Sequence, residues 1–100
     1  MRIVIKKPGE PAEARNIPNK LDEWQRLVGG YIETVTLTPH LIMIVNEEGK
    51  LLGLPDNFKW HGDYIKGNAV FVGVKDDEFF DIDAGLEADL IGFWREDAEE

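Results

Sequence analysis

One hundred residues are enough for one domain and too few for two independent hydrophobic cores. The sequence contains no cysteine and no serine, which excludes disulfides, thiolate metal sites and both kinds of nucleophile. The formal net charge of −9 disfavours direct binding to nucleic acids, because attraction to phosphates needs a basic surface.

The first part of the chain is predicted to form a strand pair followed by a helix. Residues 2–6 alternate and are rich in β-branched side chains, so they are expected to pair with residues 13–17 as a hairpin. Asn19 is a good N-cap, and Gly29-Gly30 ends the helix, because glycine takes the left-handed C-cap conformation at low cost. The helix is indicated by four apolar side chains on one face: Leu21, Trp24, Leu27 and Val28.

Strands dominate the middle of the chain. Residues 31–38 have the composition of a strand, with alternate side chains on opposite faces. Residues 41–45 form a continuous apolar run, which predicts a central strand covered on both faces, and residues 69–74 resemble it. Residues 55–68 are the least regular stretch and are interpreted as a loop.

The last part of the chain is predicted to form a closing strand over residues 79–82 and a helix capped by Asp83. The apolar positions of this helix are Leu86, Leu90, Ile91, Phe93 and Trp94.

The order of these elements lacks the regular alternation of parallel sheets. It predicts an α+β fold with a mainly antiparallel sheet of about four to six strands, covered by two helices. Residues 1–95 are expected to form a single compact domain, and residues 96–100 an acidic frayed tail.

The chemistry left to this sequence is limited. His40 and His61 do not complete a zinc site on their own, and Gly29-Gly30 follows a helix, where it cannot bind phosphates as dinucleotide folds do. Carboxylate pairs such as Glu33 with Asp63 are the remaining acid–base alternative, but twenty acidic side chains make such pairs common by chance. We therefore predict no catalytic residue, no metal and no cofactor, and expect that the protein is not an enzyme.

A second group of residues flanks the predicted strands and turns and is a candidate surface for a partner or ligand. Asparagine and aspartate also occur at such positions because they bond to nearby backbone, and the aromatic members have the alternative of capping the core. The candidates are Asn46, Glu47, Asn57, Trp60, Asp63, Tyr64 and Asn68.

Residues 76–100 carry eleven acidic side chains against Arg95 alone. Such a run either keeps a small protein in solution or attracts a basic partner. The candidates for an acidic surface are Asp76, Asp77, Glu78, Asp81, Asp83, Glu87 and Asp89.

Several short motifs occur in a characteristic order: Val28-Gly29-Gly30-Tyr31-Ile32-Glu33, then Asn46-Glu47-Glu48-Gly49-Lys50-Leu51, Gly53-Leu54-Pro55 with Asn57, and Asp63-Tyr64-Ile65-Lys66-Gly67-Asn68-Ala69 followed by Val72-Gly73. Over residues 2–82 the chain thereby resembles the family catalogued as domain of unknown function 3846. The resemblance implies a bacterial, phage or mobile-element protein, and it implies no reaction, cofactor or catalytic residue.

These observations favour a non-catalytic accessory protein of phage or mobile-element type that binds a macromolecular partner, most simply another protein. One alternative is an acidic inhibitor of a DNA-handling or defence enzyme that imitates DNA with its carboxylates. Another is a binder of a small molecule or nucleotide that uses residues 55–68. No stretch approaches the roughly 20 apolar residues of a membrane helix and no signal peptide is recognised, so we expect no membrane partner and a cytoplasmic location. The oligomeric state stays open.

Overall fold

The computed structural model describes residues 1–95, so the predicted acidic tail at 96–100 lies outside the described residues. The elements in chain order are β1 (Arg2–Lys6), β2 (Glu13–Asn16), α1 (Leu21–Val28), β3 (Ile32–Thr38), β4 (Leu41–Asn46), β5 (Asp56–Trp60), β6 (Asp63–Lys66), β7 (Ala69–Lys75), β8 (Glu78–Phe80) and α2 (Ala84–Phe93).

The main sheet is antiparallel throughout, with the strand order β2-β1-β7-β4-β3. β8 pairs with the last residues of β7, beyond the part of β7 that β1 covers. Every residue of β4 is buried, and so are the first five residues of β7. The prediction that these apolar runs are central strands is therefore confirmed, because a strand covered on both faces has no solvent-facing side that needs polar residues.

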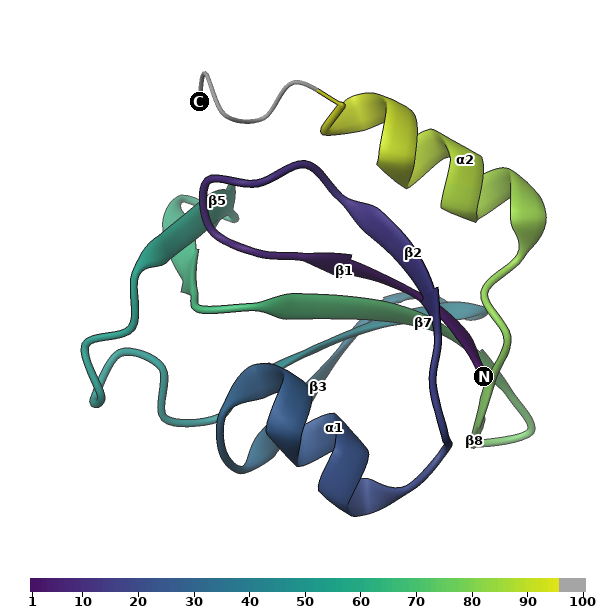
Figure 1. Ribbon diagram of the computed structural model, residues 1–100, viewed down its shortest axis with the longest axis horizontal. Coiled ribbons are helices and arrows are strands. Elements are labelled where there is room, and N and C mark those ends of the chain that lie inside the picture. Colours follow the sequence, from purple (N-terminus) through teal and green to yellow (C-terminus); the bar gives the residue numbers. More distant parts are fainter. Residues whose placement is uncertain (96–100) are drawn as a thin grey trace.

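One helix covers each face of this sheet, as Figure 1 shows. On one face, α1 packs against apolar side chains of the central strands: Ile3, Ile5, Ile42, Ile44, Val70 and Val72. On the other face, α2 and the β5–β6 hairpin cover the alternate residues, which are Val4, Leu41, Met43, Val45, Ala69 and Phe71. The α+β prediction is confirmed, and no helix within residues 1–95 is both long and apolar enough to cross a membrane.

The helix ends differ in part from the prediction. Asp83 caps α2 as expected, since its carboxylate accepts hydrogen bonds from the N–H groups of Gly85 and Leu86 at 3.0 and 3.2 Å. Asn19 does not cap α1, which begins after Lys20 without a side-chain cap. The side chain of Asn19 instead accepts a 3.0 Å hydrogen bond from the indole N–H of Trp24, because a buried indole needs an acceptor.

Two apolar side chains assigned to the helix faces do not join the core. Leu21 lies in the first turn of α1 and Phe93 at the end of α2, and 60% and 78% of their surfaces are exposed. Leu21 lies before the buried residues of α1, which begin at Trp24, and Phe93 is exposed although the next residue, Trp94, is buried.

The loop prediction for residues 55–68 is wrong. β5 and β6 form an antiparallel hairpin, and His61 and Gly62 turn it with φ values of 50° and 82°. Positive φ at both turn residues matches the right-handed twist of the strands. Phe58, Trp60 and Ile65 pack from this hairpin onto the sheet, so the open loop that a small ligand was expected to use is instead part of a covering layer.

Candidate functional site

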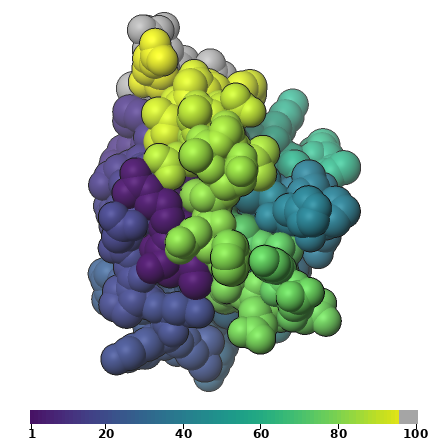
Figure 2. Space-filling model, turned by 90° about the vertical axis from the view of Figure 1, so that its right-hand side faces the viewer, coloured from purple at the N-terminus to yellow at the C-terminus, as the bar shows by residue number. Residues whose placement is uncertain are grey.

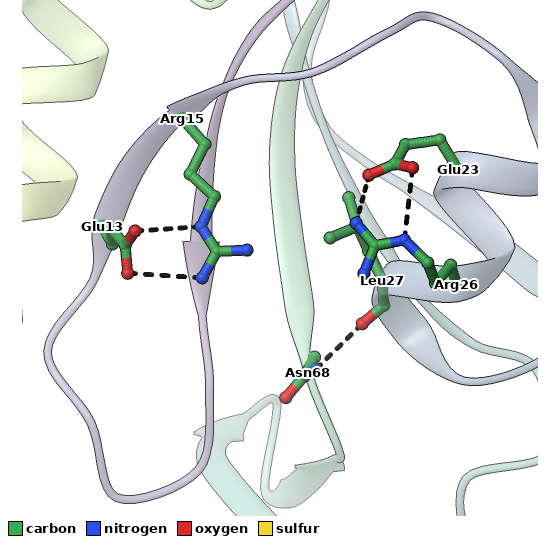
Figure 3. Close-up of polar contacts among 6 residues, drawn as sticks. All are labelled: Glu13, Arg15, Glu23, Arg26, Leu27 and Asn68. Atoms are coloured by element: carbon green, nitrogen blue, oxygen red, sulfur yellow. Dashed lines mark hydrogen bonds and ion pairs between the residues drawn. The ribbon is translucent and has the colours of Figure 1, made fainter.

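Two of the predicted partner-binding asparagines complete the C-terminal end of α1. The last carbonyl groups of a helix have no hydrogen-bond donor within the helix, so they need donors from elsewhere in the structure. The Asn46 amide donates to the carbonyl of Val28 at 3.1 Å. The Asn68 amide donates to the carbonyl of Leu27 at 2.9 Å, and Figure 3 shows this second bond. A Cβ on Gly30 would lie 2.9 Å from the Asn46 Nδ2 atom, so glycine at this position leaves room for the contact.

Asn57 joins the β5–β6 hairpin to the sheet. Its amide donates to the carbonyls of Lys6 and Gly67 at 2.7 and 2.8 Å, and its Oδ1 atom accepts from the Lys6 Nζ atom at 2.9 Å. Lys6 is fully buried, and its Nζ atom also donates to the Lys7 carbonyl at 2.8 Å and lies 5.9 Å from the ring centre of Trp94. The three asparagines therefore each donate a hydrogen bond to backbone of another element, which gives each of them a role in the fold.

The other four residues of this group are spread over the hairpin and the β4–β5 connection. Asp63 forms an ion pair with Lys50, which lowers the pKa of its carboxyl group, and it also accepts a 2.7 Å hydrogen bond from the N–H of Tyr64. Trp60 packs onto the sheet, whereas Tyr64 and Glu47 are exposed. The seven predicted residues do not converge on one site.

Three of the seven acidic candidates make contacts within the fold. Asp83 caps α2, Asp81 accepts a 2.8 Å hydrogen bond from the N–H of Arg2, and Glu87 pairs with the Arg2 guanidinium at 2.9 and 3.0 Å. The hydrogen bonds from Arg2 lower the pKa of Glu87. Figure 2 shows the N-terminal residues in purple beside the yellow-green residues of the last helix.

The remaining acidic candidates, Asp76, Asp77, Glu78 and Asp89, are exposed. Asp76 and Asp77 have φ values of 53° and 64°, so they make the tight turn between β7 and β8. These acidic side chains are divided between the β7–β8 turn and α2, so they form no continuous stripe along one strand or helix.

The direction of the backbone groups in β3 can be derived from one hydrogen bond. The carbonyl of Tyr31, just before β3, accepts from the N–H of Glu47 at 2.8 Å. In an antiparallel ladder, alternate residues direct both backbone groups to the same neighbouring strand. Glu33 and Val35 therefore bond to β4, opposite Val45 and Met43.

The residues of β3 that alternate with Glu33 and Val35 direct their N–H and C=O groups away from β4. Within residues 1–95, β3 pairs with β4 alone, so these groups lie along an open edge of the sheet. The edge is seven residues long and carries Glu33 as its one charged side chain. We define the open edge by its three outward-directed residues, Ile32, Thr34 and Thr36.

The opposite edge of the sheet is protected. Ile17 exchanges two 2.9 Å backbone hydrogen bonds with the first residue of the chain, so the same alternation leaves only Ala14 and Asn16 directed outward. β2 is four residues long and carries the ion pair of Glu13 with Arg15 seen in Figure 3, and α2 contacts it. Short length, charge, bulges and a covering helix are the usual protections of an edge strand. β3 is longer than β2 and carries Glu33 as its one charged side chain, with a bulge after Thr36, and α1 contacts it.

A hollow of about 210 Å³ opens where β3 begins. This volume is below the roughly 300–1,000 Å³ of small-molecule sites and suits a single side chain. Tyr31 and Leu52 contribute exposed apolar surface to it, with 64% and 54% of their surfaces accessible. The hollow is lined by Gln25, Gly29, Gly30, Tyr31, Glu48 and Leu52.

Within residues 1–95 there is no group of three or more histidine, aspartate or glutamate side chains that could hold an ion.

A sequence-family model matches residues 1–91 of the chain. The chain belongs to the family described as Domain of unknown function (DUF3846). No curated protein and no solved structure matches it. In this DUF3846 chain, the motifs noted in the sequence coincide with fold junctions, since Asn46, Asn57 and Asn68 each bond to backbone that lies far away in the sequence.

Sequence reasoning missed both the open edge and the hollow of the DUF3846 domain. The alternation of Thr34, Thr36 and Thr38 was visible, and it is typical of a strand with one side poorly covered. Whether that strand lies at an edge depends on the strand order of the sheet, and the alternation of side chains does not reveal this order.

Proposed function

We propose that this DUF3846 protein is a non-catalytic protein-binding module, and that a partner adds an extended segment to the open edge of β3. The observation that carries the proposal is the unpaired row of backbone groups at Ile32, Thr34 and Thr36. Such a row is a ready template for another strand, and strand addition is a recurrent mode of protein recognition.

Two further features support this proposal. The other edge strand, β2, is four residues long and carries the Glu13–Arg15 ion pair, whereas β3 is seven residues long with one charged side chain and so offers more unpaired backbone to a partner. The chain also lacks the serine and cysteine nucleophiles of covalent catalysis. The role we propose is that of an accessory protein in the cytoplasm, in the bacterial, phage or mobile-element setting that the family resemblance implies.

A proline at Thr34 tests the proposal. Proline has no N–H, and the Thr34 N–H points outward, so Thr34→Pro is expected to keep every hydrogen bond to β4 while removing one that a partner strand needs. Partner proteins captured from lysate of the source cells should be retained by wild type and by Thr34→Ala, and lost by Thr34→Pro. Circular dichroism and thermal unfolding establish that both variants are folded.

The proposal is contradicted if folded Thr34→Pro captures the same partner as strongly as Thr34→Ala does. Binding would then use another surface.

A further inference from the structure

The hollow and the open edge adjoin each other along the chain. Tyr31 borders the hollow and directly precedes Ile32, the first outward-directed residue of β3. A strand that pairs along this edge therefore reaches the hollow as it passes the beginning of β3. Every strand pair in the sheet is antiparallel, so an added strand that continues the pattern brings its C-terminal end to this point.

The hollow can accept one apolar side chain. The Tyr31 and Leu52 side chains supply its exposed apolar surface, and covering that surface together with a guest side chain is favourable at about 25 cal/mol per Å². An exposed apolar pair beside an unpaired strand edge combines the two elements of strand-addition sites, in which backbone bonds give affinity and side-chain pockets give specificity.

The charge around the hollow selects a basic guest. Glu33, Glu47 and Glu48 are exposed at the beginning of β3 and in the turn after β4, and Glu48 lines the hollow. Within residues 1–95 none of these three carboxylates takes part in an ion pair. The whole chain carries −9, so a second copy on this edge would bring like charge, whereas lysine and arginine on a guest strand would be attracted.

From this juxtaposition we infer that the partner segment is a basic, extended strand of another protein that adds antiparallel to β3 and places an apolar side chain near its C-terminal end into the hollow beside Tyr31 and Leu52. The inference rests on the proposed function and adds the chemistry, direction and anchor of the segment.

The test uses the full chain and synthetic peptides as probes. The first peptide alternates lysine and valine over seven residues and ends in a C-terminal leucine. Its controls are the isomer with leucine at the N-terminus and the analogue with glutamate in place of lysine. We expect the first peptide to bind at low salt and to shift the amide resonances of Ile32, Thr34 and Thr36, with both controls at least about tenfold weaker, since tenfold corresponds to about 1.4 kcal/mol.

A matched pair of variants isolates the hollow. Leu52→Lys places a charge in the hollow. It is expected to lower the affinity for the first peptide by about tenfold or more, which is the equivalent of losing one buried apolar side chain. Leu51→Lys makes the same change at the neighbouring residue, which is 81% exposed and does not line the hollow, and should leave the affinity within about twofold of wild type.

The outcomes separate this inference from the proposed function. If the β3 amides shift but Leu52→Lys and Leu51→Lys bind alike, or the acidic peptide binds as well as the basic one, the inference is overturned and strand addition stands. Failure of the basic peptide to bind, or a dimer formed by the free chain through β3, also overturns the inference. The proposed function itself is tested separately, by the capture experiment with Thr34→Pro.

Discussion

Replacing Asn57 with alanine is expected to lower the free energy of unfolding by about 2–4 kcal/mol, because buried groups that lose their hydrogen-bond partner cost about 1–3 kcal/mol each. The Asn57 side chain bonds to the carbonyls of Lys6 and Gly67 and to the Nζ atom of buried Lys6. Alanine removes all of these contacts, including the hydrogen bonds that link the β5–β6 hairpin to β1. Urea unfolding followed by circular dichroism measures the change.

Asn16→Ala is the matched control. Asn16 is exposed on the edge strand β2, so its replacement should change stability by no more than about 0.5 kcal/mol. Asn57→Asp provides a second comparison, because it keeps an acceptor for Lys6 but loses both donors to the carbonyls. Stability of Asn57→Ala equal to that of Asn16→Ala would show that the hairpin is held mainly by its apolar contacts.

Gly73→Ala is expected to destabilise the protein by about 3 kcal/mol, at the upper end of the range for overpacking. Gly73 lies in β7, where a Cβ atom would stand 2.6 Å from the carbonyl oxygen of Asp81 and 3.0 Å from that of Phe80. Both neighbours are backbone, so neither can move aside by rotating a side chain. The segment that leads from β8 to α2 must shift, which also disturbs the bond from Arg2 to Asp81. Thermal and urea unfolding both report the loss.

The same substitution at Gly92 provides a control of opposite sign. Gly92 lies in α2, and apart from its chain neighbours and the backbone of its own helix, no atom of residues 1–95 would lie within 4 Å of its added Cβ. Gly92→Ala should therefore stabilise the protein by about 0.5–1 kcal/mol through helix propensity. If Gly73→Ala and Gly92→Ala had similar stabilities, this would contradict the close contact of residues 80–81 with Gly73 in β7.

The sequence allowed prediction of the elements whose signal is local. The run from Leu41 to Val45 has no polar position, and only a strand buried on both faces accommodates that pattern. Asp83 was recognised as a cap because its bonds to Gly85 and Leu86 span two and three residues. In such cases all the interacting residues are close together in the sequence, so the element can be predicted without knowledge of the fold.

Features that depend on distant residues could not be predicted. Asn57 bonds to Lys6 across 51 residues, and in sequence it looks like an ordinary turn asparagine. β1 and β4 are separated by β7, which comes later in the chain than both, so no local pattern identifies β3 as the edge. The β5–β6 hairpin did carry a signal, since Phe58 and Trp60 alternate before the turn at His61-Gly62, but glycine and asparagine on both sides obscured it.

Hydrogen exchange of the β3 amides, resolved by NMR, tests the central claim that β3 is an open edge that a partner strand completes. In the free protein, the amides of Glu33 and Val35 should exchange slowly and those of Ile32, Thr34 and Thr36 rapidly, because only the first two donate to β4. With the basic peptide or a captured partner bound, the three fast amides should become protected while the other two change little. Protection of all five in the free protein, or three amides that stay fast in the complex, would contradict the account.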